Sequence, residues 1–73
     1  MGKNSEKKNF IFDTSALISL GAIKIIDEIL SLARIIITPS VINELEEFSK
    51  YDDEYGKASK EVLNYKDKFI VKK

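Results

Sequence analysis

Two carboxylates are the residues of this sequence best suited to chemistry. Asp13 interrupts the apolar run FIFDTSALI and is followed by two hydroxyl residues, Thr14 and Ser15. Glu44 stands in a later segment, TPSVINELEEFSK. Carboxylates are ligands for hard cations such as Mg²⁺ or Mn²⁺, which can activate a water molecule and offset charge on a phosphoryl oxygen. The two hydroxyl groups are suited to donate hydrogen bonds to a carboxylate or to a phosphate.

Asp13 also has a simpler interpretation, as the N-cap of a helix. An aspartate there accepts a hydrogen bond from a backbone N–H group that the helix leaves free. Both interpretations, cap and metal ligand, remain open from the residues alone.

Composition excludes several classes of site. The chain of 73 residues has no cysteine and no histidine, which rules out disulfides, Cys/His zinc sites and histidine-based triads. Its 12 basic and 12 acidic residues cancel, so overall charge does not indicate nucleic-acid binding. No segment approaches the ~20 apolar residues of a membrane span, and the polar start does not resemble a signal peptide. We therefore expect a cytoplasmic protein with no membrane contact.

The hydrophobic pattern predicts one small α/β domain, residues 10–73, after a flexible arm, residues 1–9. Three consecutive isoleucines from Ile35 to Ile37 suggest a strand buried on both faces, and Thr38-Pro39 is a helix start signal. The predicted strands are residues 10–12, 34–38 and 69–71. The predicted helices are residues 16–20, 22–33, 39–49 and a last one that ends at about Tyr65 and carries Tyr55, Ala58, Val62 and Tyr65 on one face.

The order of these elements brings the two carboxylates together. Alternating strands and helices favour a parallel sheet with helical crossovers, and the carboxyl ends of its strands share one rim. Asp13 follows the first strand directly, and Glu44 lies about one and a half turns into the helix after the second. Glu44 flanks the apolar stripe of Val41 and Phe48, so we expect it to turn toward the same cleft as Asp13.

The segments FIFDTSALI and IIITPSVINELEEFSK resemble the first half of a PIN domain. These small metal-dependent nucleases include toxins of bacterial and archaeal toxin–antitoxin pairs and several RNA-processing nucleases. The resemblance covers residues 10–71 and is strongest to the archaeal and RNA-processing branches. It implies a three-layer-type α/β fold, Asp13 and Glu44 as catalytic metal ligands, and Thr14 and Ser15 as polar companions that contact substrate. It also implies Mg²⁺ or Mn²⁺ as cofactor and hydrolysis of RNA phosphodiester bonds.

The sequence also departs from the family pattern. The further aspartates of the family's second half have no counterpart, since Asp52, Asp53 and Asp67 are interpreted as turn or helix-start residues. The carboxylate site is thus incomplete relative to the family. The alternative function is a non-catalytic module, built on a shortened PIN-like fold, for dimerisation or for binding RNA or a partner chain.

The first strand is central in the family's sheet, and a shortened fold would leave it as an exposed edge. Two copies joined there about a two-fold axis would pair antiparallel, with their Asp13 residues at opposite rims. We expect the lysines Lys50, Lys57 and Lys60 to be solvated, and Tyr55 and Tyr65 to lie at the edge of the core.

Overall fold

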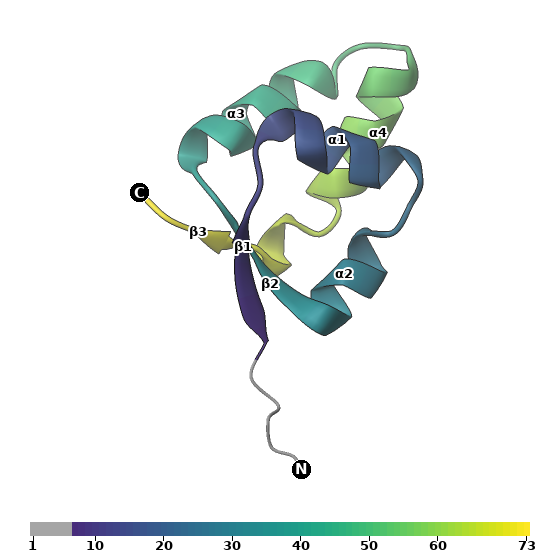
Figure 1. Cartoon of the computed structure of the whole chain (residues 1–73). Coiled ribbons are helices and arrows are strands. Elements are labelled where there is room, and N and C mark those ends of the chain that lie inside the picture. The colour runs from purple at the N-terminus through teal and green to yellow at the C-terminus, as the bar shows by residue number, and fades with distance from the viewer. Residues whose placement is uncertain (1–6) are drawn as a thin grey trace.

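The computed structural model describes residues 7–73, and these form a mixed α/β fold (Figure 1). The three strands of this part of the chain make one parallel sheet in the order β1-β2-β3. The small α/β fold with a short parallel sheet predicted from the sequence is therefore confirmed. In chain order the elements are β1 (Lys8–Ile11), α1 (Thr14–Ala22), α2 (Ile26–Leu32), β2 (Ala33–Ile37), α3 (Pro39–Phe48), α4 (Glu54–Leu63), the 3₁₀ turn η1 (Lys66–Lys68) and β3 (Ile70–Val71).

The helices bury one face of the sheet. Figure 1 shows α1, α2 and α4 to one side of the strands. Burial alternates along β2: Ile35 and Ile37 are buried, Ile36 between them is only partly buried, and Arg34 is exposed. The predicted burial of the isoleucine run on both faces is therefore wrong for Ile36, which is only partly buried among residues 7–73.

The uncovered face of the sheet carries a row of isoleucines. Ile11 pairs with Ile36, and Ile36 pairs with Ile70, so the three side chains stand on the same side of adjacent strands. Ile11 is 79% exposed and Ile70 is 38% exposed.

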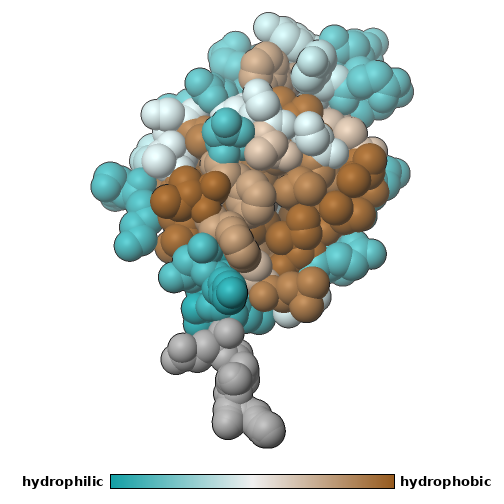
Figure 2. All heavy atoms as spheres, in the orientation of Figure 1, coloured by the Kyte–Doolittle hydropathy of each residue, from teal (hydrophilic) through white to brown (hydrophobic). Residues whose placement is uncertain are grey.

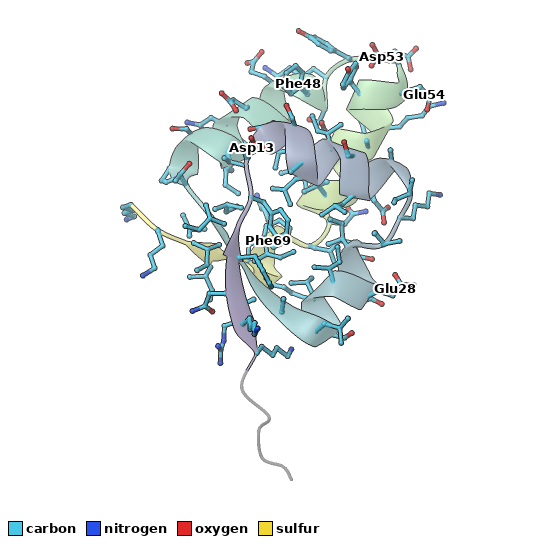
Figure 3. All side chains as sticks on the ribbon, in the orientation of Figure 1. Asp13, Glu28, Phe48, Asp53, Glu54 and Phe69 are labelled. Carbon is cyan, nitrogen blue, oxygen red and sulfur yellow. The ribbon has the colours of Figure 1, made fainter. Side chains whose placement is uncertain are left out.

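One hydrophobic core lies between the sheet and the helices. Phe69 belongs to this core and precedes β3, whereas the sequence had suggested it as the first residue of that strand (Figure 3). The buried members are Leu17, Ile18, Ile26, Ile35, Ile37, Val41, Leu45, Ala58, Val62 and Phe69.

The first two helices divide at a different place from the one predicted. α1 runs through Gly21 to Ala22, and the chain then turns at Lys24, whose φ is 59°. The N–H of Ile25 donates to Leu20 O at 3.2 Å and the N–H of Lys24 to Gly21 O at 3.1 Å, the pair of bonds that closes a Schellman motif. The predicted boundary at Gly21 is wrong because the left-handed position of this motif is occupied by a lysine.

Gly21 is instead a packing residue. A Cβ atom placed on it would lie 2.6 Å from the backbone oxygen of Ala58 and 2.7 Å from a methyl group of Val62. The absence of a side chain is what allows α1 and α4 to pack this closely.

The other boundaries follow local capping. Thr38 caps α3 as predicted, and Asp53 caps α4 by accepting a hydrogen bond from Gly56 N at 3.0 Å, which confirms its helix-start role. Gly56 lies within the first turn of α4, at a position where a Cβ atom would overlap Tyr51 O. β1 begins at Lys8, two residues inside the predicted arm, and residues 1–6 of that arm lie outside the described residues.

Candidate functional site

Asp13 stands at the carboxyl end of β1 and caps α1 (Figure 3). Its backbone is extended, with φ −89° and ψ 177°, and its Oδ1 accepts a hydrogen bond from Ala16 N at 2.9 Å. The cap interpretation therefore describes a contact that the structure contains. The residue is exposed, and the protein hydrogen bonds found among residues 7–73 use only one of its two carboxylate oxygens. The other oxygen is available to a ligand from solvent.

Thr14 connects Asp13 to Glu44. Its side chain is buried, and its hydroxyl group donates a hydrogen bond to Glu44 Oε1. Because Thr14 begins α1 and Glu44 lies in α3, this bond joins the rim after β1 to the helix after β2. Of the two carboxylates expected to face one cleft, Asp13 directly precedes Thr14 in the chain, and Glu44 accepts the hydrogen bond of the Thr14 hydroxyl. The sequence predicts that the Thr14 hydroxyl donates to a carboxylate or to a phosphate, and in the structure it donates to a carboxylate.

The donor set at this rim is small. No cluster of three or more acidic, histidine or cysteine side chains suited to a metal ion occurs within residues 7–73. Asp13 and Glu44 are a pair of oxygen donors, which suits a cation that keeps several waters. Mg²⁺ in particular is often bound through one or two carboxylates, with water and substrate phosphate completing its shell.

Ser15 lies on the wall of a hollow next to this rim. The hollow has a volume of about 400 Å³ and is bounded on one side by Ser15 and Ser19 of α1, and on the other by the rings of Phe48 and Tyr55. The ring centroids of Phe48 and Tyr55 are 6.2 Å apart. Sequence reasoning missed Ser19 and Phe48 here, although Ser15 and Ser19 are four residues apart and so share a helix face.

The two tyrosines expected at the core edge differ in burial. Tyr65 is partly buried and packs against the core, as predicted, whereas Tyr55 is 60% exposed, so that prediction is wrong for Tyr55. Tyr55 is at the second position of α4, where its ring reaches Phe48 rather than the sheet. The pKa of Tyr65 is raised above the ordinary tyrosine value, first by desolvation and then by the carboxylates of Glu61, Asp27 and Glu28.

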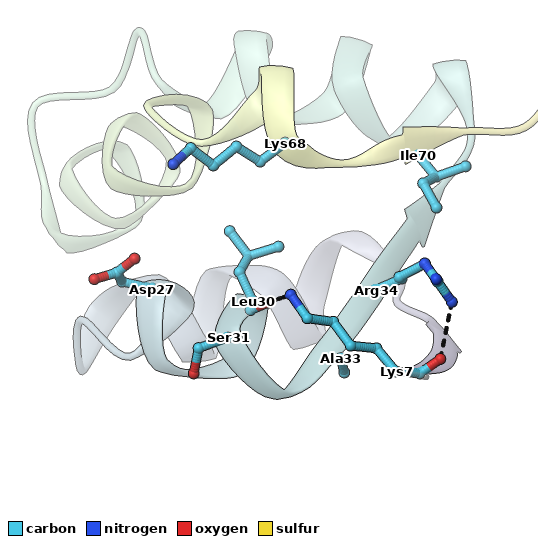
Figure 4. A pocket seen from close by; sticks show the side chains of 8 residues that line it. All are labelled: Lys7, Asp27, Leu30, Ser31, Ala33, Arg34, Lys68 and Ile70. Carbon is cyan, nitrogen blue, oxygen red and sulfur yellow. Dashed lines mark hydrogen bonds between the residues drawn. The ribbon is translucent and has the colours of Figure 1, made fainter. Parts of the chain in front are cut away.

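A second hollow lies at the opposite end of the sheet (Figure 4). It has a volume of about 470 Å³ and is formed between α2, the start of β2, and the η1–β3 segment. Lys7 Nζ donates to Leu30 O at 2.9 Å, and Arg34 Nη1 donates to Lys7 O at 2.9 Å. These bonds tie the residue before β1 to α2 and β2. Asp13 and Glu44 do not line this hollow, so it is separate from the carboxylate rim.

Comparison of the chain with models of known protein families, with curated proteins and with solved structures finds no match. In the part of the chain that the structure describes, no helix has both the length and the apolar character required to cross a membrane.

Proposed function

We propose that the protein is a PIN-like, metal-dependent ribonuclease in which Asp13 and Glu44 bind Mg²⁺ or Mn²⁺. The observation that supports this proposal is the hydrogen bond from Thr14 to Glu44, which ties a carboxylate of α3 to the residue directly after Asp13. The buried Thr14 hydroxyl fixes Glu44, and the α1 cap fixes Asp13, so both carboxylates are held in place before a cation binds.

The residues present fit a hard cation. Asp13 is exposed and offers an oxygen that the α1 cap does not use, and Glu44 offers Oε2, since Thr14 occupies Oε1. When bound, the cation would activate water and offset charge on the phosphodiester. Thr14 orients the Glu44 carboxylate, and the exposed Ser15 hydroxyl is free to donate to a phosphate oxygen.

The test is cleavage of single-stranded RNA by the purified chain in Mg²⁺ or Mn²⁺. We expect metal-dependent cleavage that falls at least tenfold in Asp13→Asn and in Glu44→Gln. Glu47→Gln is the matched control, because Glu47 is exposed on the same helix and its one ion pair within residues 7–73 is with Lys50, at 3.3 Å. Absence of cleavage at every protein concentration, or equal cleavage by all variants, would contradict the proposal.

A second candidate function, a non-catalytic assembly module, has its own observation in favour. The outer edge of β1 has no strand paired to it within residues 7–73, and all four residues of β1 are exposed. Natural edges are usually kept from pairing by charge, proline, bulges or short length. Here the middle of the edge carries Phe10, 47% exposed, and Ile11, 79% exposed. Analytical ultracentrifugation tests this candidate directly, and a monomer throughout the micromolar range would argue against it.

A further inference from the structure

The outer edge of β1 has a defined set of free backbone groups. Phe12 N donates to Ile36 O of the neighbouring strand at 3.2 Å. In a strand of a parallel sheet, every second residue directs both its N–H and its C=O group toward the same neighbouring strand. Because Phe12 faces β2, the backbone groups of Phe10 and Lys8 also face β2. Asn9 and Ile11 therefore direct their N–H and C=O groups outward, and the hydrogen bonds found within residues 7–73 leave these groups without a backbone partner.

Apolar side chains surround this edge. Figure 2 shows hydrophobic atoms gathered over the middle of the face where Figure 1 has β1. Phe10 shares its register with the buried Ile35 and so stands on the helix-covered side of the sheet, while Ile11 stands on the uncovered side beside Ile36. A strand added at this edge would thus cover apolar surface on both faces at once.

We propose that this edge binds a second copy of the chain, antiparallel, with the two-fold axis passing between the two Phe10 residues. In this register Asn9 of each copy lies opposite Ile11 of the other, and each such pair exchanges two N–H···O bonds. The proposal deepens the second candidate function above and does not depend on the carboxylate site.

The neighbouring two-fold registers are less favourable. Centring the pair on Asn9 would require the carbonyl of Lys7, which already accepts a hydrogen bond from Arg34 at 2.9 Å. Centring it on Ile11 would require the carbonyl of Asp13, which accepts from Leu17 N at 3.1 Å. In the register centred on Phe10, the two pairs formed by Asn9 and Ile11 use neither of these carbonyls.

Self-association at this edge meets no net-charge repulsion and covers apolar surface. The chain as a whole has a formal net charge of +0, so two copies do not repel each other through net charge. Phe10 of each copy lies opposite Phe10 of the other, which covers rings that are 47% exposed in one chain.

The first experiment is sedimentation equilibrium of the full chain. We expect a mass that rises with concentration toward twice that of one chain. Asn9→Pro should abolish this rise, because the proline removes an outward N–H but no bond to β2, and such prolines are tolerated on edge strands. Ile11→Lys should do the same, whereas Ile23→Lys, at a 64% exposed position between α1 and α2, should not. A wild-type monomer at all concentrations, or a dimer that survives Asn9→Pro with its affinity unchanged, would overturn the proposal.

The second experiment tests the register. The chain has no cysteine, so a single introduced cysteine can form only an intermolecular disulfide. Opposed residues at a non-hydrogen-bonded position have Cα atoms about 4.5 Å apart, within the range of a disulfide. Phe10→Cys should therefore cross-link under mild oxidation. Ile11→Cys should not, because its counterpart lies diagonally, at about 7–8 Å. Equal or reversed cross-linking of the two variants would refute the register, and circular dichroism of both establishes that they fold.

Discussion

Replacing Asp13 with serine separates its two roles, because serine keeps an acceptor for Ala16 N and removes the carboxylate. Asp13→Ser should cost a few tenths of a kcal/mol of unfolding free energy without metal, and Asp13→Ala about 1 kcal/mol. If Asp13 is also a metal ligand, a cation at ten times its dissociation constant adds RT ln 11, about 1.4 kcal/mol, to the unfolding free energy of the wild type. In a domain of this size that is a rise in Tm of roughly 6–11 °C.

The assay is thermal unfolding followed by far-ultraviolet circular dichroism, in chelator and in Mg²⁺ or Mn²⁺. We expect the wild type to gain stability from the cation, and both Asp13 variants to lose most of that gain. Asp53→Ser is the matched control, since Asp53 caps α4 through Gly56 N at 3.0 Å in the same way and should leave the metal gain intact. If Asp13→Ser gains as much from the cation as the wild type, Asp13 is only a cap and the metal reasoning fails.

Three further changes test the packing and the electrostatics. Gly21→Ala should lower the unfolding free energy by about 1–3 kcal/mol in a urea titration, because the new Cβ would lie 2.6 Å from Ala58 O. This loss is expected despite the better helix propensity of alanine. An increase in stability would show that α1 and α4 are not held this close. Ser59→Ala should leave the unfolding free energy unchanged or raise it by up to about 1 kcal/mol in the same titration. The reason is that the buried Ser59 hydroxyl has no hydrogen-bond partner among the described residues. A clear loss of unfolding free energy would reveal a partner for this hydroxyl. The pKa of Tyr65 is raised in the folded state, so as pH rises the unfolded chain loses the Tyr65 proton before the folded chain does. The contribution of the protonated Tyr65 to stability is therefore full below the ordinary tyrosine pKa and declines as pH rises through the pKa of the folded state. Tyr65→Phe should flatten that part of the alkaline stability profile, and an unchanged slope would contradict the shift.

Residues whose role depends on near neighbours were predictable from the sequence. Thr38-Pro39 begins α3 and Asp53 begins α4, because an N-cap acts on N–H groups only two or three residues ahead. The predicted ends of each strand differ from the observed ends by at most two residues, because short β-branched runs flanked by caps leave few alternatives.

Errors arose where packing overruled local preference. Gly21 looked like a helix end, yet it lies in α1 because α4 passes against it, and Lys24 takes the left-handed position at which glycine is more common. The isoleucine run of β2 is buried on one face, because apolar residues alone do not tell how many helices will cover a sheet.

By itself, the sequence determined the alternation of strands and helices, the caps, and the delivery of Asp13 to the end of a strand. These depend on side-chain periodicity and on bonds within one turn of the chain. Only the tertiary structure decided that the Thr14 hydroxyl meets Glu44, 30 residues later, and that the free backbone groups of the β1 edge belong to Asn9 and Ile11. Those contacts depend on how α3 and β2 pack against the first unit, and no local pattern contains that information.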